Sequence, residues 1–549
     1  MSQSHSSQLR LLTPDQEAQV LAITNDLLTG NAAGVPDYLT EDIEAVRGQC
    51  GIRTEKIPVE PGIELDACIA WPRGEGPHPL IVMPAGLDQS GWKMYGGAII
   101  RLLMRGYAVV AYTERGLAES GGELTVAGPE DVTDGRTVID WALAHNDIKA
   151  DPEKVGMAGI SYGSGISQLV ANEHPAVKAV VALSTWADLG EALYDNGTRH
   201  LAAAEALGSI SDRPSAELTK VLESFRANTD IDEVVLAYAR PRSPAKLDDE
   251  QRRPVPTFFT TFWHETIFPQ NQLLDYFDRY PGPKRLDIAV GDHSALEVAG
   301  LMLGVYTRTT EAAYDWFDHY LLDVDNGIDR DGVVHTESMH TFTTATAPDL
   351  RSWWNPMRRY YFRAPATGSE DGTLTLDPPE QLSQSFQAGA GQVQAARTLV
   401  FDGILERLLM PNRQRLEDVN RAWAAVWRIP RAFLKAQHIA GIPKVKLTVT
   451  SSSRTATLIT YLFDHNPFTG AMRIITHAAA TLESAESGTP MTLEVDLQAT
   501  DYHIPVGHRL VVVMGTVDHL YGAASDRSAT VITLSNDKGS GYLDLPIAP

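Results

Sequence analysis

The chain has 549 residues, of which 43% are hydrophobic and 21% charged, and its formal net charge is -24. This is the composition of a globular protein with more than one hydrophobic core, and the acidic excess disfavours nucleic acid or an anionic membrane as a partner. The two cysteines, Cys50 and Cys68, fit neither a disulfide framework nor a zinc cluster. The first residues lack the profile of a secretory signal, and no apolar run is long enough to cross a membrane. We therefore expect a cytoplasmic protein.

The first predicted element is a helix over residues 13–30, in an N-terminal helical extension that covers residues 1–48. Buried strands and helices then alternate over residues 49–190 and again over residues 251–345. Strands that are buried on both faces appear in a sequence as short continuous apolar runs, such as PLIVMPAG and YAVVAYTERG here. The alternation predicts an α/β fold with a doubly wound parallel sheet and helices on both faces.

The alternation stops over residues 191–250, where three helical patterns follow one another with no strand between them. We expect this segment to form a helical cap over the mouth of a site. Residues 350–549 carry short strand-like runs, among them TLVFDG at 398–403, separated by Gly, Pro, Ser and Asp. This spacing predicts a C-terminal β-sandwich or jelly-roll domain.

The segment Gly159-Ile160-Ser161-Tyr162-Gly163 stands between a predicted strand and a predicted helix. A serine hydroxyl is a weak nucleophile unless a base accepts its proton and donors stabilise the charge on the attacked carbonyl. The G-x-S-x-G elbow of α/β-hydrolases meets both needs with a sharp strand-to-helix turn. A pattern with three fixed positions can arise by chance, but this one occurs once, inside a βαβ series. We predict that Ser161 is a nucleophile.

A catalytic triad of this fold needs an acid and a histidine downstream of the serine. His293 falls on the loop after the last core strand, and Glu265 follows the preceding strand. Glu265 would hold the imidazole in the tautomer that accepts a proton from Ser161. Asp188 is an alternative acid, although it could instead cap the helix that follows it. We expect Asp292 to point away from the site.

We expect neither a metal site nor a cofactor. His264 alternates away from Glu265 on an extended segment, and His174, His503, His508 and His519 are interpreted as surface or structural residues. No pair of them has metal-ligand spacing together with a third ligand.

Several segments resemble the family of X-Pro dipeptidyl-peptidases and cocaine esterases, which are α/β-hydrolase serine hydrolases with a jelly-roll domain. The matching segments are AYTERGLAESGGEL, DGRTVIDWALAHNDIKADPEKVGMAGISYGSG, FWHETIFPQNQ, GDHS, YDWFDHYL and, near the C-terminus, YYF, IAGIPKVKLTVTSS and VGHRLVVVM. The resemblance implies the same triad, in which the family's acid is usually aspartate. Esterases of the cocaine-hydrolysing type also supply an oxyanion donor from a tyrosine, and MPAGLDQSGW has none at that place. We therefore assign the oxyanion hole to the backbone N–H of Tyr162 and that of Gly86 or Leu87.

The predicted function is hydrolysis of an ester or amide bond, in a small organic or peptide-like substrate, through an acyl-enzyme on Ser161. Trp92, Trp186, Tyr194 and Trp263 are candidates to line an apolar pocket. Three alternatives stay open: acyl transfer or cyclisation through the same acyl-enzyme, an X-Pro-type dipeptidyl peptidase, and a binding protein with a vestigial triad. No anchor for the free amino group of an X-Pro substrate is evident, so esterase or amidase activity ranks higher. A homo-oligomer is also left open.

Overall fold

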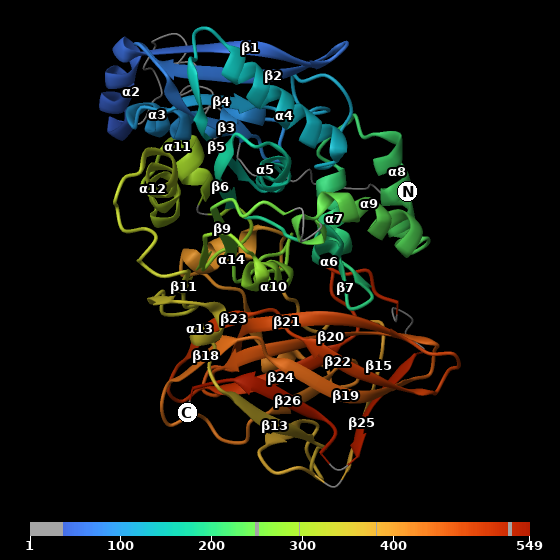
Figure 1. Ribbon diagram of the computed structural model, residues 1–549. Helices are drawn as coiled ribbons and strands as arrows, with labels where there is room; N and C mark the ends of the chain where they lie inside the picture. The colour runs from blue at the N-terminus through green and yellow to red at the C-terminus, as the bar shows by residue number, and fades with distance from the viewer. Residues whose placement is uncertain are drawn as a thin grey trace.

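The computed structural model describes residues 37–247, 252–295, 297–379, 381–524, 530–537 and 539–548. The helix predicted over residues 13–30, and most of the predicted N-terminal extension, lie outside the described residues. Within them, an α/β domain in the first part of the chain lies against a strand-rich domain in the second part (Figure 1). No helix in the described part is both long enough and apolar enough to cross a membrane.

The α/β domain contains a ten-stranded sheet in the order β1-β2-β4-β3-β5-β6-β9-β10-β11-β12. The seven strands from β4 to β11 are parallel, whereas β1, β2 and β12 pair antiparallel at the two edges. The prediction of a doubly wound sheet is confirmed, with the correction that the sheet is mixed. Its strands are β1 (Cys50–Glu60), β2 (Ile63–Pro72), β3 (His78–Pro84), β4 (Ala108–Tyr112), β5 (Ala150–Ile160), β6 (Val177–Leu183), β9 (Thr257–Phe262), β10 (Lys284–Ala289), β11 (Val334–Glu337) and β12 (Thr344–Ala347).

Helices cover both faces of this sheet, because successive side chains of each buried strand point to opposite faces. In β3, Leu80 and Val82 belong to one hydrophobic core, and Ile81 and Met83 belong to the other. The first core also contains side chains from α4, α5 and α10, and the second contains side chains from α2, α3, α11 and α12. These helices are α2 (Asp37–Gln49), α3 (Gly96–Met104), α4 (Pro129–Ala144), α5 (Tyr162–Glu173), α10 (Asn271–Arg279), α11 (Glu297–Leu303) and α12 (Arg308–Leu322).

The segment between β6 and β9 forms a mainly helical cap beside α5 (Figure 1). It contains one short hairpin that the sequence reading missed, formed by β7 and β8. The hairpin strands have only two residues each, too few for a period-2 pattern to show in the sequence. The cap elements are α6 (Leu189–Leu193), β7 (Tyr194–Asp195), β8 (Thr198–Arg199), α7 (Leu201–Gly208), α8 (Ala216–Ala227), a π-helix (Ile231–Leu236) and α9 (Ala237–Ala239).

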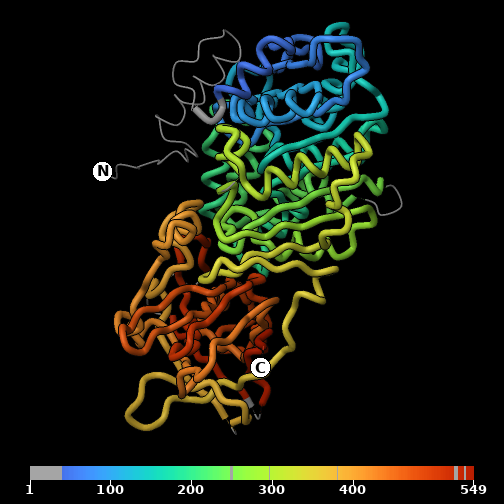
Figure 2. The backbone as a smooth tube through the Cα atoms, turned by 90° about the vertical axis from the view of Figure 1, so that its left-hand side faces the viewer, coloured from blue at the N-terminus to red at the C-terminus, as the bar shows by residue number. Residues whose placement is uncertain are grey.

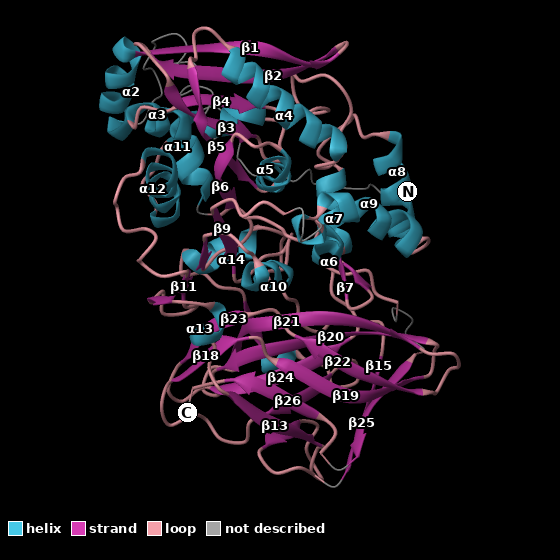
Figure 3. Ribbon diagram, in the orientation of Figure 1, coloured by secondary structure: helices cyan, strands magenta, loops and turns pink. Residues whose placement is uncertain are grey.

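The C-terminal part of the chain is rich in strands, as predicted (Figure 3). A 12-stranded sheet and the separate pair β18–β23 account for most of it. Strands such as β19 alternate buried and half-buried residues, which is the pattern of a sheet with one face toward a core. The strands are β13 (Met357–Arg363), β14 (Gly372–Thr375), β15 (Gln381–Gln387), β16 (Arg413–Arg415), β17 (Ala425–Arg428), β18 (Gln437–Gly441), β19 (Lys444–Ser451), β20 (Thr455–His465), β21 (Ala471–Glu483), β22 (Pro490–Asp496), β23 (Thr500–Ile504), β24 (Arg509–Gly515), β25 (Val531–Asp537) and β26 (Tyr542–Pro546).

One predicted strand of this part is wrong. TLVFDG leads into a helix, α14 (Phe401–Arg407), and the described residues of this part also form the short helix α13 (Leu350–Trp353). A short apolar run does not by itself distinguish a strand from a helix, and here the run continues as Ile404 and Leu405. Although α14 comes late in the chain, it lies beside the α/β domain (Figure 1).

The two domains contact each other through aromatic and polar side chains, and Figure 2 shows the β domain below and to the left of the α/β domain. Trp263, at the end of β9, stacks on Trp353 of α13 with ring centroids 5.3 Å apart. The Asp501 carboxylate on β23 accepts hydrogen bonds from the Trp353 indole at 2.9 Å and from the Ser338 hydroxyl. The predicted residue bounds of the domains stay predictions.

Candidate active site

Ser161 lies at the turn between β5 and α5, and its backbone is strained, with φ 53° and ψ -115°. The glycines around it are required by close contacts between backbones. A Cβ atom at Gly159 would lie 2.2 Å from the carbonyl of Gly163, and one at Gly163 would lie 2.0 Å from the carbonyl oxygen of Pro84. The turn therefore forces the serine side chain out over the end of the sheet, as the G-x-S-x-G pattern predicts.

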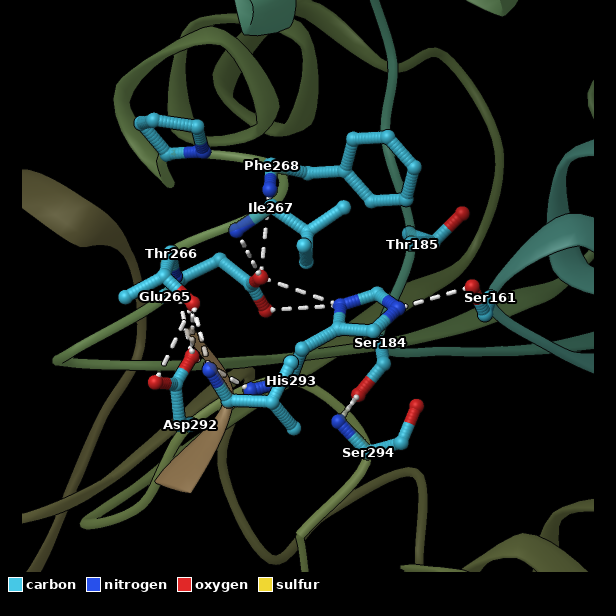
Figure 4. A network of polar contacts seen from close by, with 12 residues as sticks. Ser161, Ser184, Thr185, Glu265, Thr266, Ile267, Phe268, Asp292, His293 and Ser294 are labelled. Atoms are coloured by element: carbon cyan, nitrogen blue, oxygen red, sulfur yellow. Dashed lines mark hydrogen bonds and ion pairs between the residues drawn. The ribbon is translucent and has the colours of Figure 1, made fainter. Parts of the chain in front are cut away.

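His293 and Glu265 converge with Ser161 at this edge of the sheet (Figure 4). The imidazole Nε2 of His293 lies 2.7 Å from the Ser161 hydroxyl oxygen. Its Nδ1 lies 3.0 and 3.2 Å from the two carboxylate oxygens of Glu265. All three side chains are buried, so these contacts are made in a region of low dielectric. The geometry joins a hydroxyl, an imidazole and a carboxylate in one hydrogen-bonded series.

The loop after β9 fixes the Glu265 carboxylate. Its Oε1 accepts hydrogen bonds from the backbone N–H groups of Ile267 and Phe268, at 3.0 and 3.1 Å. The Phe268 ring packs edge-on against the His293 imidazole, with centroids 5.2 Å apart. No sequence pattern indicates this role for Phe268, because the contact depends on how two loops fold together.

Three carboxyl groups act on the charge state of His293. Burial lowers the pKa of His293, but the nearby carboxylates, Glu265 first among them, outweigh burial and raise this pKa above its ordinary value. Asp292 and Glu297 contribute in the same direction. The environment therefore stabilises the protonated form of the imidazole. A histidine that acts as a general base reaches this form after it has accepted a proton.

Asp188, the alternative acid, is engaged elsewhere. Its carboxylate accepts a hydrogen bond from the N–H of Glu191 at the start of α6 and pairs with the Lys246 ammonium at 2.7 Å. Asp292 accepts hydrogen bonds from the N–H of His293 at 2.7 Å and of Thr266 at 2.9 Å, on the far side of the loop from the imidazole ring (Figure 4). Both carboxylates therefore support the backbone and do not contact the ring nitrogens of His293.

The two backbone candidates for the second oxyanion donor differ in availability. The N–H of Gly86 points at the Met94 sulfur at 2.9 Å, which leaves it turned away from the site. The N–H groups of Leu87 and Tyr162 have no hydrogen-bond partner in the described part of the chain. Because both residues line the same cavity as Ser161, we favour Leu87 over Gly86.

An apolar cavity opens from Ser161 into the cap. One hydroxyl and one indole on its wall have hydrogen-bond partners outside the cavity. Tyr238 donates to the carbonyl of Thr125, and Trp186 donates to the carbonyl of Arg242. The cap supplies much of the wall, including Leu193, Leu207, Leu218, Val221, Phe225 and Val235. No carboxylate lines the cavity among the described residues.

The four predicted pocket aromatics divide into two pairs. Trp186 and Tyr194 line the cavity. Trp92 and Trp263 do not, because each is packed in a different part of the core: the Trp92 indole donates to Asp66 at 2.7 Å, and the Trp263 indole donates to the carbonyl of Glu337 at 2.7 Å. Residue type alone predicts burial of a tryptophan, but it does not predict which cavity the ring faces.

Glu297 is a fully buried carboxyl group close to this site that the sequence reading missed. Its oxygens accept hydrogen bonds from the hydroxyls of Ser184, at 2.6 Å, and Thr260. The Ser184 hydroxyl in turn accepts from the N–H of Ser294, next to His293 (Figure 4). Burial raises the pKa of Glu297 to about 7. No motif marks this residue, because its partners come from separate segments of the chain: Ser184 follows β6, and Thr260 lies within β9.

Glu297 is expected to make the stability of the folded protein depend on pH. A carboxyl group whose pKa is raised on folding stabilises the fold below its unfolded pKa of about 4.5, and this contribution is lost as the pH rises through about 7. Glutamine does not titrate, so the stability of Glu297→Gln does not fall with pH at this position. The melting temperature of the variant minus that of wild type should therefore increase from pH 5 to pH 8, by an amount that corresponds to roughly 3 kcal/mol. The assignment would be contradicted if the difference in melting temperature between the variant and wild type were the same at pH 5 and at pH 8.

His438, Asp501 and His503 form a cluster whose ligating atoms lie within 4.8 Å of one another. The two imidazole rings stack at 4.2 Å with their planes only 10° apart. A metal ion lies in the plane of each imidazole that binds it, so one ion does not fit two rings stacked in parallel. Asp501 is also engaged by His438 Nε2, at 2.7 Å. We interpret the cluster as part of the contact between the domains.

Two family models match successive parts of the chain. The X-Pro dipeptidyl-peptidase (S15 family) matches residues 61–295, and the X-Pro dipeptidyl-peptidase C-terminal non-catalytic domain matches residues 326–535. The chain belongs to the S15 family. A relative from Bacillus anthracis, provisionally named an Xaa-Pro dipeptidyl-peptidase, is 22% identical over 458 residues, or 76% of this chain and 70% of that protein. A protein of the same provisional name from Streptomyces avermitilis is 23% identical over 504 residues, or 75% and 67%.

Solved structures show the same fold as this S15 member. An aminopeptidase from a marine sediment Thaumarchaeota archaeon has a TM-score of 0.68 at 16% identity and covers 91% of this chain and 97% of its own. A CocE/NonD family hydrolase from Staphylococcus aureus has a TM-score of 0.67 at 14% identity, with 90% and 94% covered. The S15 relationship makes this chain a serine hydrolase of peptide or ester bonds.

Proposed function

We propose that this S15 member hydrolyses esters of uncharged, apolar carboxylic acids with a Ser161–His293–Glu265 triad. The observation that carries the proposal is the hydrogen-bonded series at 2.7 and 3.0 Å, which ends at the mouth of an apolar cavity. The first part of the proposal concerns the chemistry, and the second concerns the acyl group.

In the proposed mechanism, His293 accepts the proton of Ser161 as the hydroxyl oxygen attacks the carbonyl carbon of the substrate. The Glu265 carboxylate accepts a hydrogen bond from Nδ1, which directs the Nε2 lone pair at the serine and stabilises the imidazolium. The N–H groups of Tyr162 and Leu87 stabilise the negative oxygen of the tetrahedral intermediate. His293 then gives its proton to the leaving group, and later activates the water that releases the acid.

The cavity receives the acyl group. The leaving group must lie near His293 Nε2, because it takes its proton from that atom. The acyl part therefore extends away from His293, from the two N–H donors into the cap. A free ammonium in that cavity would be buried without a counter-charge, which costs several kcal/mol. We therefore expect uncharged aliphatic and aromatic acyl groups to react best.

An X-Pro dipeptide is the second candidate substrate, because the names of the relatives favour it. A proline ring would suit the apolar wall, but the N-terminal ammonium needs a carboxylate. Tyr194 also borders a separate polar pocket between the cap and the β domain, which is lined by five carboxylates: Glu191, Asp195, Asp275, Asp278 and Asp496. Asp195 is already paired with His200 at 2.7 Å, and the other four side chains are exposed, which makes all five weak partners for an ammonium.

Two ester pairs test the proposal, because each pair differs only in one ammonium group. The p-nitrophenyl esters of 3-phenylpropanoic acid and of L-phenylalanine form one pair, and those of 3-methylbutanoic acid and of L-valine form the other. We expect kcat/KM to be at least about 100-fold higher for the uncharged member of each pair, from the cost of burying an unpaired ammonium. Ala-Pro p-nitroanilide is expected to react more slowly than either uncharged ester.

Labelling with an alkyl fluorophosphonate separates the two parts of the proposal. If Ser161 is labelled but the amino-acid esters react as fast as their uncharged partners, the acyl preference is wrong and the triad stands. If peptide mapping shows Ser161 unlabelled in the folded protein, the triad itself is wrong.

A further inference from the structure

Helix α14 comes from the C-terminal part of the chain, yet it contacts the two loops that carry Glu265 and His293. In Figure 1 it lies between the two domains, next to the end of β9 of the α/β domain. The family description of the C-terminal domain is non-catalytic. The contacts of α14 with these two loops give that domain a definite part in the site.

The first contact is with the histidine loop. Gly403 packs directly on the backbone at Gly291 and Asp292, just before His293. A Cβ atom at Gly403 would lie 2.3 Å from the carbonyl carbon and oxygen of Gly291, and 2.6 Å from the nitrogen of Asp292. Only glycine allows the helix to approach this closely.

The second and third contacts are with the acid loop, on both sides of Glu265. The Glu406 carboxylate lies 2.5 Å from Nε2 of His264, and both side chains are largely buried. The N–H of Val400, at the start of the helix, donates to the Thr266 hydroxyl at 2.9 Å. That hydroxyl in turn donates to Asp292 at 3.0 Å and so links the two loops.

We infer that α14 is a positioning element, which sets the distance between the Glu265 carboxylate and the His293 imidazole through Gly403 and Glu406. The inference rests on the proposed triad. Three successive contacts of one short helix fall on the immediate chain neighbours of the acid and the histidine. The neighbours of Ser161, by contrast, pack against Pro84, Ala85 and Trp186 of the α/β domain. A displaced α14 should therefore misalign the base while it leaves the nucleophile turn and the cavity in place.

Gly403→Ala tests the inference, with Gly515→Ala as the matched control. Gly515 lies on β24 of the same domain, and a Cβ atom there would meet nothing within 4 Å. With p-nitrophenyl 3-phenylpropanoate, we expect Gly403→Ala to lower kcat at least about tenfold, because an ångström-scale misplacement of a catalytic group has effects of this size. KM should stay within about twofold, since the cavity wall does not include α14. The rate of fluorophosphonate labelling at Ser161 should fall with kcat.

Glu406→Ala and Glu406→Gln test independently whether α14 positions the two loops. They remain informative if Gly403→Ala does not fold. Glutamine keeps an oxygen that can accept a hydrogen bond from His264, so kcat should fall in the alanine variant and return to within about twofold of wild type in the glutamine variant. A Gly403→Ala protein that is folded and as active as Gly515→Ala would overturn the inference, as would a Glu406→Ala protein with wild-type kcat. An unlabelled Ser161 in the wild-type protein would instead refute the triad.

Discussion

Replacing Ser161 with alanine is expected to lower kcat/KM for p-nitrophenyl 3-phenylpropanoate by at least about 10⁴-fold. The substitution removes the only oxygen that lies within hydrogen-bond distance of His293 Nε2 in the described structure. Without it, the remaining N–H donors and the cavity still bind the ester, but no acyl-enzyme forms. Fluorophosphonate labelling should disappear with activity, and the melting temperature should change little.

Ser167→Ala is the matched control for this experiment. Ser167 is also a buried serine of α5, and its hydroxyl donates to the Gly163 carbonyl at 2.8 Å, not to the imidazole. This variant should keep its activity within about threefold, because it loses one hydrogen bond of modest energy. A Ser161→Ala enzyme that retains a tenth of the wild-type rate would exclude Ser161 as the nucleophile.

Glu265→Gln is expected to lower kcat by about 10³- to 10⁴-fold while the fold is preserved. Glutamine can still accept from the N–H groups of Ile267 and Phe268, which bond the same oxygen in the wild-type protein. Its amide nitrogen would then face His293 Nδ1 as a donor. Oε1 stays 3.0 Å from Nδ1, but the negative charge that stabilises the imidazolium is lost. The amide nitrogen near Nδ1 also favours the tautomer with the proton on Nε2, which cannot accept the proton of Ser161.

Two further variants check that the fall in kcat is specific to Glu265 and does not follow from the loss of another buried carboxylate. Glu265→Asp keeps the charge but shortens the side chain by one methylene, so its kcat should be intermediate. Asp188→Asn removes the alternative acid, which pairs with Lys246, and should leave kcat within about threefold. If Asp188→Asn proved as inactive as Glu265→Gln, the acid would have to be reassigned.

The residues whose positions follow from the order of elements were predictable from the sequence. Ser161 follows a strand and precedes a helix, and its glycine neighbours are needed wherever two backbones approach as closely as at Gly163. Glu265 and His293 follow successive core strands, and parallel strands end at the same edge of a sheet. These three side chains could therefore be expected to lie together.

Contacts between segments that are distant in sequence could not be predicted in this way. The Met94 sulfur occupies the N–H of Gly86, and no local pattern indicates that the two would meet. Apolar patterning shows that Trp263 is buried, but not which ring it stacks on. The strand predicted for TLVFDG is wrong for a related reason. The helix α14 has only seven residues and packs on another domain, so its sequence carries too little periodicity to identify it as a helix.

The insertion of the cap between β6 and β9 has a consequence for how this scaffold can diversify. The three side chains of the proposed triad come from turns at the end of the sheet, whereas most of the cavity wall comes from one continuous stretch of the polypeptide. Changes confined to that stretch would reshape selectivity and leave the proton transfers untouched. Enzymes that descend from a common ancestor could thus come to act on different substrates while they keep the same reaction.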